Sequence, residues 1–295
     1  MTTSALVTLF YPDENTAKNI EKLSEQTTKI FLLDNTPENP CNERFSHIKN
    51  AEYIYLGENL GLSSAFNKAL REITFVKESD FILFFDQDSW ITEKFVQNLI
   101  SDFQKLSRTH NIGLLGPVYF DSTKKKYGGI TKHCEKISQG IFKTTEIITS
   151  GMITTYKNLK KIGFWDESIF LDYADFELCW RMIQNGFGIF ITENALLNHS
   201  LGSGFLNINL ILKKLYLSYS PPLREYYQTR AAVKLLRRNY IPKNWRKNFM
   251  FNLTVRILFF TFRLPKKFQR LKYFFLGLKD GLKNRSGELK NLCQK

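Results

Sequence analysis

Cysteine is scarce, and its spacing excludes two kinds of site. Four cysteines occur among 295 residues, at positions 41, 134, 179 and 293, and none belongs to a Cys-x-x-Cys pair. Zinc sites and dithiol redox centres are commonly built on such pairs, so neither is expected. Four widely separated cysteines also do not indicate the disulfide framework of a small secreted domain.

Long hydrophobic runs and targeting signals are also missing. No stretch reaches the ~20 apolar residues that a membrane-spanning helix needs. The nearest, residues 250–262, is interrupted by Asn252, Thr254 and Arg256. The N-terminus enters a strand-like run without a preceding basic segment, so no signal peptide is expected. We therefore expect a cytoplasmic protein.

Acidic residues become scarce in the last third of the chain. Residues 205–295 contain 21 Lys and Arg but only 3 Asp and Glu, whereas residues 1–204 contain 21 and 25. We therefore expect one domain over residues 1–205 and a basic, amphipathic helical region over residues 206–295. This asymmetry indicates an anionic partner, either a nucleic acid or a membrane surface. The alternative is a solvated helical bundle that only packs on the first domain.

Strand-like and helix-like segments alternate up to about residue 120. This alternation predicts an α/β fold, in which helices cover both faces of a mostly parallel sheet. Ligands of such sheets bind at the carboxyl ends of the strands. Asp34, Asn59–Gly61 and the Asp86/Asp88 pair each follow a strand. Strands are expected over residues 5–10, 29–33, 52–56 and 81–85, and helices over residues 15–24, 63–73 and 93–106.

The remaining chain is less regular. Residues 113–165 show no clear period, residues 170–185 predict a helix, and residues 187–192 predict a short strand. A flexible loop is expected over residues 199–204. Prolines then divide the basic region into helices over residues 223–240, 243–263 and 266–284. The last two have apolar stripes, and the first has a basic stripe at helical spacing, consisting of Arg230, Lys234, Arg237 and Arg238.

Two aspartates end the most apolar strand. Phe81–Phe85 is a buried-strand run, and Asp86-Gln87-Asp88 follows it directly. In extended backbone, positions i and i+2 point to the same side, so both carboxylates would face one hard cation. Such a cation is typically shared with substrate phosphates, which suits chemistry on a nucleotide diphosphate. The alternative is a polar turn without a ligand.

These residues belong to a longer ordered set of motifs. The motifs are Thr8–Pro12, Leu33–Asn35, Asn59–Ser63, Phe85–Ser89, Ser150-Gly151, Gly163–Glu167, Phe170–Arg181 and His199–Gly202. In their joint order and spacing, they resemble those of the family 2 inverting glycosyltransferases with the GT-A fold, especially bacterial rhamnosyltransferases of cell-surface polysaccharide synthesis. The resemblance covers about residues 4–205.

The resemblance implies a role for each matching residue. It assigns Asp86 and Asp88 to a divalent metal, Mg²⁺ or Mn²⁺, with His199 as a further ligand. The remaining implied contacts are Tyr11, Asp34, Asn59, Gly61 and Asp86 on the donor side and Gly151 and Trp165 on the acceptor side. Alone, Asp34 also fits a turn or cap, Asn59–Gly61 a helix-entry turn, and His199 a capped loop histidine.

The resemblance also implies a catalytic base, Asp175. Ala174 precedes it where the family commonly has Glu, and Asp172 lies three residues earlier, so Asp172 remains the alternative. On a helix, residues three apart share a face, and like charges so close raise one of the two pKa values. A base must also lie within hydrogen-bond reach of the acceptor hydroxyl. The structural alternative is an acidic helix N-terminus that complements the helix dipole.

The activity implied is metal-dependent, inverting transfer of a sugar, with rhamnose from dTDP-rhamnose favoured. The donor would be a dTDP- or UDP-sugar, and the acceptor a lipid-linked or growing polysaccharide. The basic region would then hold the enzyme peripherally at the inner face of the cell membrane, with no nucleic-acid partner. Two alternatives are a nucleotidyltransferase, disfavoured by the absence of a Gly-rich loop after the first strand, and a nucleic-acid-binding protein.

Overall fold

The computed structural model describes residues 2–72, 77, 80–122, 125–199, 205–210, 213–218, 221–255 and 264–289. The chain divides into two compact units. The first comprises Met1–Phe170, Ala174–Ser200 and Gly287–Lys295, and the second comprises Leu171–Tyr173 and Leu201–Ser286. The domain division inferred from the sequence, residues 1–205 and 206–295, stays a prediction.

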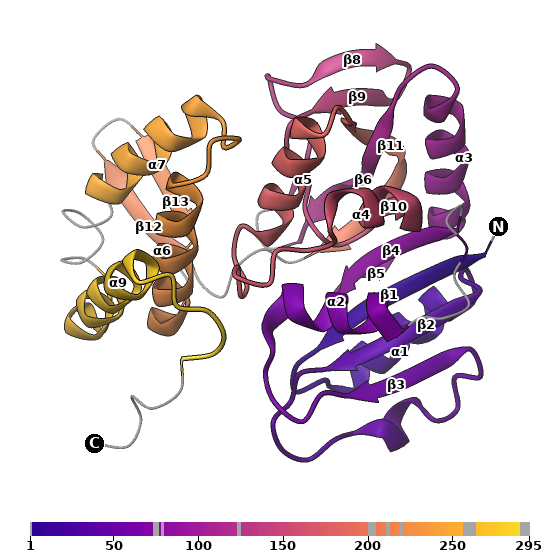
Figure 1. The fold of residues 1–295 in the computed structure, drawn as a ribbon, viewed down its shortest axis with the longest axis horizontal. Coiled ribbons are helices and arrows are strands. Elements are labelled where there is room, and N and C mark those ends of the chain that lie inside the picture. The colour runs from indigo at the N-terminus through magenta and orange to yellow at the C-terminus, as the bar shows by residue number, and fades with distance from the viewer. Residues whose placement is uncertain are drawn as a thin grey trace. The chain divides into compact units, whose positions relative to one another are not determined.

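The first unit is built on one large sheet (Figure 1). Its first half is parallel, with the order β3-β2-β1-β4. These strands are β1 (Thr3–Leu9), β2 (Lys29–Asp34), β3 (Ala51–Tyr55) and β4 (Phe81–Asp86). The four predicted strands are therefore confirmed. In β1, β2 and β4, burial on both faces explains why the sequence lacks polar alternation.

The sheet continues beyond β4 in the order β10-β6-β11-β9-β8. In this half only β6 and β11 pair in parallel, and the other pairs are antiparallel. The short strands β5 and β7 pair with β11 and β6. The bounds are β5 (Trp90–Ile91), β6 (Ile112–Asp121), β7 (Lys126–Gly128), β8 (Glu135–Ser138), β9 (Ile141–Thr144), β10 (Met152–Thr155) and β11 (Gly188–His199).

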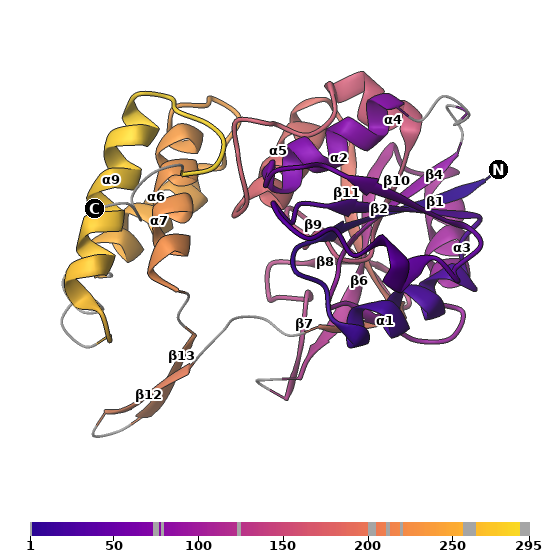
Figure 2. The same ribbon diagram turned by 90° about the horizontal axis from the view of Figure 1, so that it is seen from below.

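Helices cover both faces of this sheet, as predicted (Figure 2). On one face lie α1 (Glu14–Ser24) and α3 (Phe95–Ser107). On the other lie α2 (Gly61–Glu72), α4 (Tyr156–Ile162) and α5 (Ala174–Gln184). A 3-10 turn, η1, spans Asn42–Phe45. The mixed α/β class with a mostly parallel central sheet is thus confirmed.

Local sequence explains where α1 begins. Asp13 accepts a hydrogen bond from the backbone N–H of Thr16, and the Thr16 side chain bonds back to the Asp13 backbone. This capping box satisfies two otherwise unpaired N–H groups, and its hydrogen bonds lower the pKa of Asp13. Ala17, Ile20 and Leu23 then recur at helical spacing and pack on the sheet.

Two elements differ from the sequence-based expectation. The helix expected over residues 170–185 begins only at Ala174, because Tyr173 has φ +67°, outside the helical region. The strand expected over residues 187–192 instead runs from Gly188 to His199, through a bulge between Thr192 and Leu196. The segment 113–165 is also more regular than expected, since it contains strands of the main sheet.

The second unit contains a hairpin and helices. The hairpin joins β12 (Phe205–Leu210) to β13 (Lys213–Ser218), in a region that was expected to be helical. The helices are α6 (Pro222–Leu236), α7 (Lys243–Val255) and α9 (Lys267–Leu282). Residues 256–263 of the expected helix 243–263 and Ile73 of the helix 63–73 lie outside the described residues. Among the described residues, no helix has the length and apolar character needed to cross a membrane.

Candidate active site

The parallel register brings the polar ends of three strands together. On one side of β1, Leu9 pairs with Asp34 of β2, and on the other, Thr8 pairs with Asp86 of β4. The order β3-β2-β1-β4 reverses direction between β1 and β4, which is where ligands of such sheets bind. Asp34 and Asp86 therefore end two strands on either side of β1, and Tyr11 follows the end of β1 by two residues, at the same sheet edge.

The Asp86–Asp88 pair lies on a turn. β4 ends at Asp86, and the N–H of Ser89 donates to the carbonyl oxygen of Asp86 at 3.2 Å, which closes the turn. The expectation that both carboxylates project from one side of extended backbone is therefore wrong. Asp86 is half-buried, whereas Asp88 is exposed. Exposure keeps the second carboxylate accessible to a ligand from solvent.

Ser150 fixes the first of these carboxylates. Its hydroxyl donates to Asp86 Oδ2 at 2.8 Å, and its Oγ accepts the Asp86 N–H at 3.0 Å. Ser89 adds a further hydrogen bond to Ser150 Oγ at 2.7 Å. The neighbouring Gly151 has φ +78°, and a Cβ there would lie 2.7 Å from Pro117 Cγ. The Ser150-Gly151 pair therefore fixes the carboxylate and the backbone N–H of Asp86 in position. The sequence motif marks this position, but the role of its serine becomes visible only in the structure.

Gln87 ties the aspartate turn to the loop after β1. Its Oε1 accepts the N–H of Phe10 at 2.7 Å, and its Nε2 donates to the Phe10 carbonyl at 3.1 Å. The next residue, Tyr11, has φ +49° and is 61% exposed. An exposed aromatic ring at this edge offers a surface on which a nucleobase can stack. The role of Gln87 was not recognised from the sequence.

Asp34 is fully buried beneath that loop. Its Oδ1 accepts the N–H of Thr36 at 2.9 Å, and its Oδ2 accepts the hydroxyl of Tyr53 and the thiol of Cys41. Burial, with a contribution from the hydrogen bond to Asp34, raises the pKa of Tyr53, so its phenol stays a donor. Burial and the Asp34 charge also raise the pKa of the Cys41 thiol.

The residues after Asp34 connect three loops. Thr36 Oγ1 accepts the N–H of Tyr11 at 2.8 Å, and Asn35 Oδ1 accepts the N–H of Leu60 at 3.0 Å. Both Asn35 and Thr36 are buried. The Asp34–Thr36 segment thus sets the position of Tyr11 on one side and of the Asn59–Gly61 loop on the other. A run of three polar residues after an apolar strand was the available sequence signal for this function.

Gly61 is required by geometry at the start of α2. It has φ +77°, and a Cβ would lie 2.4 Å from the carbonyl oxygen of Phe170. That carbonyl accepts the N–H of Leu62 at 2.8 Å. Asn59 Oδ1 accepts the Gly61 N–H at 3.1 Å, and its Nδ2 donates to Glu288. Asn59 therefore shapes the loop through its own side chain.

The two candidate bases have different surroundings. Asp175 is the second residue of α5, is half-buried, and accepts the N–H of Phe176 at 2.9 Å. Asp172 precedes the helix and belongs to the second unit. Its Oδ1 lies 3.0 Å from Arg224 Nε in an ion pair and accepts a hydrogen bond from Gln228 Nε2 at 3.3 Å. The expectation that both carboxylates share one helical face is therefore wrong.

A buried ion pair anchors α5. Glu177 is fully buried and accepts from Arg181 Nε at 2.7 Å and from Nη2 at 3.0 Å. Arg181 also donates to the carbonyl oxygen of Ile162, at the end of α4, at 2.6 Å. Two hydrogen bonds within the pair and one to a neighbouring helix fix the first turns of α5, and with them the backbone of Asp175.

Trp165 and His199 complete the set predicted from the sequence. Trp165 is 2% exposed, and its ring packs on Phe66 and Phe84 at centroid distances of 5.2 and 5.0 Å, so the structure places it in the core. The backbone of His199 ends β11, which pairs with β5 just after the aspartate turn. The His199 side chain and residues 200–204 lie outside the described part. Within that part, no cluster of three or more His, Cys, Asp or Glu side chains has the arrangement of a metal site.

Known proteins resemble this chain in sequence. The family model described as "Glycosyl transferase family 2" matches residues 6–163. A dTDP-rhamnosyl transferase, RfbF of Shigella flexneri, is 30% identical over 248 residues, which cover 81% of each chain.

Solved structures resemble it in fold. The S. aureus TarS 1–349 complex with UDP-GlcNAc has a TM-score of 0.56 at 14% identity and covers 96% of this chain and 81% of that one. GalNAc-T7 with UDP, GalNAc and Mn²⁺ also has a TM-score of 0.56, at 11% identity over 82% of this chain, which spans only 52% of that protein. These neighbours show the GT-A fold. The chain therefore belongs to glycosyl transferase family 2 and is a glycosyltransferase that resembles the rhamnosyltransferases of that family.

Proposed function

We propose that this enzyme transfers rhamnose from dTDP-rhamnose to a hydroxyl of a lipid-linked or growing cell-surface polysaccharide, with inversion at the anomeric carbon. The main support is the sheet edge, where Asp34 and Asp86 end the strands on either side of β1 and Tyr11 follows β1 by two residues. The donor is favoured by the 30% identity to a dTDP-rhamnosyl transferase. Because the chain belongs to a glycosyltransferase family, we prefer this function to the two alternatives, a nucleotidyltransferase and a nucleic-acid-binding protein.

Donor binding is assigned to the loops that the Asp34–Thr36 segment organises. Tyr11 offers its exposed ring to the base, and Gln87 and Thr36 hold the backbone on either side of that ring. Asp34 is fully buried, with donors on both carboxylate oxygens, so we assign it to shaping the base pocket as well as to contacting the imide N–H. Asn59 and Gly61 are assigned to the donor side through the loop that Asn35 holds.

A divalent ion fits the aspartate turn chemically. Asp86 and Asp88 supply hard carboxylate oxygens, Ser150 orients one of them, and Asp88 is exposed. We assign both aspartates, with His199, to holding Mg²⁺ or Mn²⁺, and one similar structure, GalNAc-T7, holds Mn²⁺ together with UDP. Such an ion supplies charge stabilisation for a departing diphosphate.

Asp175 is proposed as the general base. The acceptor oxygen forms a bond to the anomeric carbon while the bond from that carbon to the diphosphate oxygen breaks, and the hydroxyl proton passes to the Asp175 carboxylate. Asp172 is less suited, because a guanidinium and an amide already engage its carboxylate. Trp165 supports the acceptor side by packing, and Gly151 does so by holding the Ser150 loop.

A donor panel tests the proposal. Purified enzyme with Mg²⁺ or Mn²⁺ is assayed for thermal shift and for slow hydrolysis with dTDP-rhamnose, UDP-GlcNAc and a GDP-sugar. We expect the largest stabilisation and the fastest hydrolysis with dTDP-rhamnose. A clear preference for another nucleotide sugar would overturn the donor assignment while leaving the family unchanged.

A further inference from the structure

The helix α9 buries its polar face. Arg270, Tyr273, Gly277, Asp280 and Gly281 are the buried residues of this helix, and they lie on one side at helical spacing. This side packs against α6, and the approach is so close that a Cβ on Gly277 would lie 2.6 Å from the Tyr226 carbonyl oxygen. The apolar stripe predicted for this helix is therefore not its packing face.

Hydrogen bonds lock this orientation. Asp280 Oδ2 accepts the Tyr226 hydroxyl at 2.9 Å, and Arg230 Nη1 donates to the same hydroxyl at 3.0 Å. Burial raises the pKa of Tyr226 to about 12, so the phenol keeps its proton at neutral pH. Arg270 forms an ion pair with Glu225. Rotating α9 to bury its apolar side would leave these charged groups without partners, which is strongly unfavourable for buried charges.

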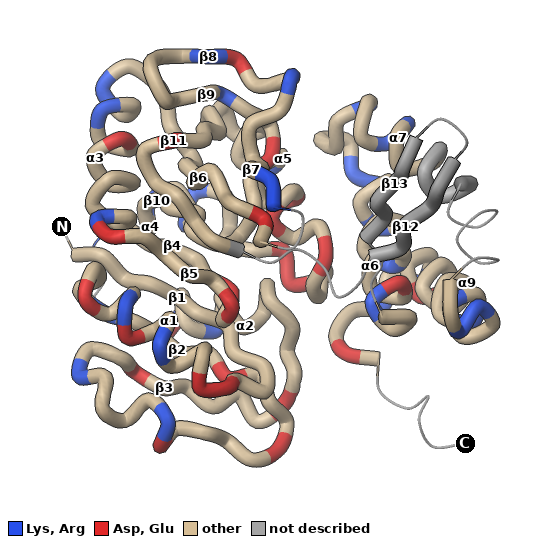
Figure 3. The backbone as a smooth tube through the Cα atoms, turned by 180° about the vertical axis from the view of Figure 1, so that it is seen from behind, with Lys and Arg blue, Asp and Glu red and all other residues tan. Residues whose placement is uncertain are grey.

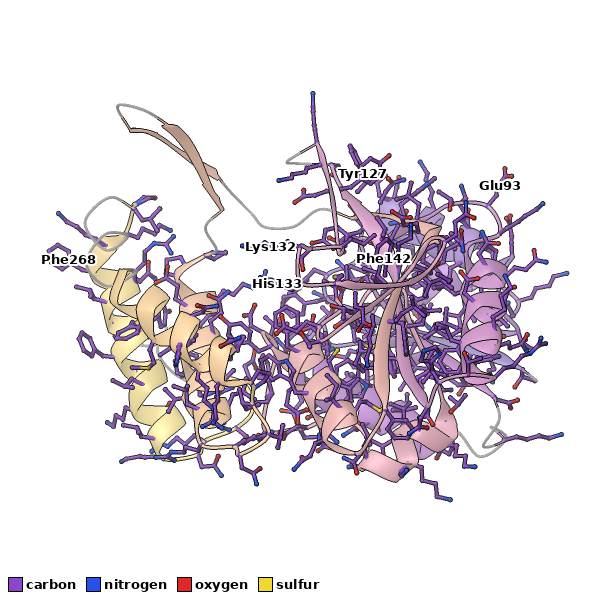
Figure 4. All side chains as sticks on the ribbon, turned by 90° about the horizontal axis from the view of Figure 1, so that it is seen from above. Glu93, Tyr127, Lys132, His133, Phe142 and Phe268 are labelled. Atoms are coloured by element: carbon purple, nitrogen blue, oxygen red, sulfur yellow. The ribbon has the colours of Figure 1, made fainter. Side chains whose placement is uncertain are left out.

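The outward side of α9 is half apolar and half basic. Phe268 is 78% exposed, Phe275 59% and Leu282 53%, and they repeat every seven residues along one line. Lys272, Lys279 and Lys283 are exposed and form an adjacent line, by the 3.6-residue period. The only acidic residue of α9, Asp280, is 2% exposed. Figure 4 shows Phe268 pointing outward from the helix.

This composition selects one kind of partner. Large exposed apolar side chains are rarely left in a line on a soluble protein unless they bind something. A parallel line of lysines, unopposed by exposed acid on this helix, complements a negatively charged surface. Half of the basic stripe predicted on α6 is unavailable to such a partner, because Arg230 and Lys234 are 2% and 3% exposed and bond within the unit. Figure 3 shows the basic positions along α9.

We propose that the outward face of α9, formed by Phe268, Phe275, Leu282 and the three lysines, docks on an anionic lipid bilayer. The phenylalanines and the leucine insert between the headgroups, and the lysines contact lipid phosphates. This surface extends the proposed function, because it brings the enzyme to the membrane that holds a lipid-linked acceptor.

The test is vesicle co-sedimentation of the full chain over a salt range. Vesicles of phosphatidylglycerol and phosphatidylcholine are compared with vesicles of phosphatidylcholine alone. We expect binding to the anionic vesicles that weakens with salt. The double variant Phe268→Ser/Phe275→Ser is expected to lower the partition coefficient by about ten-fold or more, because two apolar anchors are lost. Lys272→Gln/Lys279→Gln is expected to weaken binding and flatten its salt dependence.

Matched controls lie on the first unit. Tyr127 is 64% exposed, and Lys132 and Lys136 are also exposed. Tyr127 and Lys132 are labelled in Figure 4. Tyr127→Ser therefore removes an exposed aromatic ring, and Lys132→Gln/Lys136→Gln removes two exposed positive charges, at sites away from α9. Both controls are expected to bind like the parent. Equal losses in the control and α9 lysine variants would overturn the proposal, because net charge alone would then explain binding.

Two further readouts separate the remaining outcomes. Light scattering reports whether the parent is a dimer that Phe268→Ser/Phe275→Ser turns into a monomer. If it does, and the parent does not bind vesicles, the outward face of α9 binds a second copy of the chain and the proposal is overturned. Donor hydrolysis without vesicles is expected to be unchanged in this variant. Failure of hydrolysis in the parent would count against the proposed function, whereas vesicle binding would still decide the α9 assignment.

Discussion

At the scale of single residues, the site depends on side chains that position backbone. Ser150 orients Asp86, Gln87 grips Phe10, and Thr36 holds Tyr11. The aspartates could be found from sequence, because carboxylates after apolar strands have a recognisable pattern. The positioning residues could not, because their partners lie 25 to 77 positions away along the chain.

The base assignment gives the first prediction. Asp175→Asn is expected to lower turnover by ~10²–10⁴-fold, the usual contribution of a general base, while donor affinity is kept. Asp172→Asn serves as the matched control and is expected to be milder, because Asp172 bonds to Arg224 and Gln228. Steady-state kinetics and donor titration measure both. A severe loss in the Asp172 variant with a mild one in the Asp175 variant would reverse the assignment.

The aspartate turn gives the second prediction. EDTA is expected to abolish transfer, and added Mg²⁺ or Mn²⁺ to restore it. Asp88→Ala is expected to weaken calorimetric donor binding in the presence of metal but not the thermal stability of the free protein, because Asp88 is exposed. Glu93→Ala, which removes another exposed carboxylate, is the control and is expected to leave donor binding unchanged. Full transfer in EDTA would contradict the metal assignment.

At the scale of elements, the periodicity of apolar residues predicted which helices and strands exist better than it predicted where each of them begins and ends. The apolar strands β1, β2 and β4 and the helix α1 start within two residues of their predicted positions. The late start of α5 was hidden, because Tyr173 adopts a positive φ that its residue type does not favour. The buried face of α9 was also hidden, because glycine and paired charges pack there instead of apolar side chains.

Close packing of α9 on α6 gives the third prediction. An alanine normally stabilises a helix interior by about 1 kcal/mol relative to glycine. At Gly277 the added Cβ would lie 2.6 Å from a backbone oxygen, so overpacking, at about 1–3 kcal/mol, is expected to exceed that gain. Gly277→Ala should therefore lower the free energy of unfolding in urea titration. Lys279→Ala, on the exposed side of the same helix, should stay within about 0.5 kcal/mol of the parent, and an equal or higher stability for Gly277→Ala would contradict the packing.

At the scale of the whole molecule, the basic residues after position 204 serve two different purposes. The excess of basic residues after position 204 indicated an anionic partner for this region. In the structure, Arg230, Lys234 and Arg270 are buried and bond inside the second unit. Composition alone could not separate these structural cations from the exposed lysines of α9, since both recur at helical spacing.

Truncation gives the fourth prediction. Removing residues 266–295 deletes Arg270 and Asp280, the partners of Glu225 and Tyr226, so buried polar groups of α6 lose their partners. We expect the shortened protein to aggregate or to melt several degrees lower in a thermal scan. The surface variant Phe268→Ser/Phe275→Ser should melt like the parent. A truncated protein with unchanged melting would show that α9 contributes little to the second unit.

The most direct test of the central claim is the stereochemistry of transfer. The enzyme is incubated with dTDP-rhamnose, metal and a soluble saccharide acceptor, and the anomeric configuration of the new linkage is read by NMR. Direct attack by a hydroxyl that Asp175 deprotonates predicts inversion relative to the donor, and linkage formation slowed by ~10²–10⁴-fold with Asp175→Asn. A product with retained configuration, or transfer that survives the Asp175 substitution undiminished, would contradict the account.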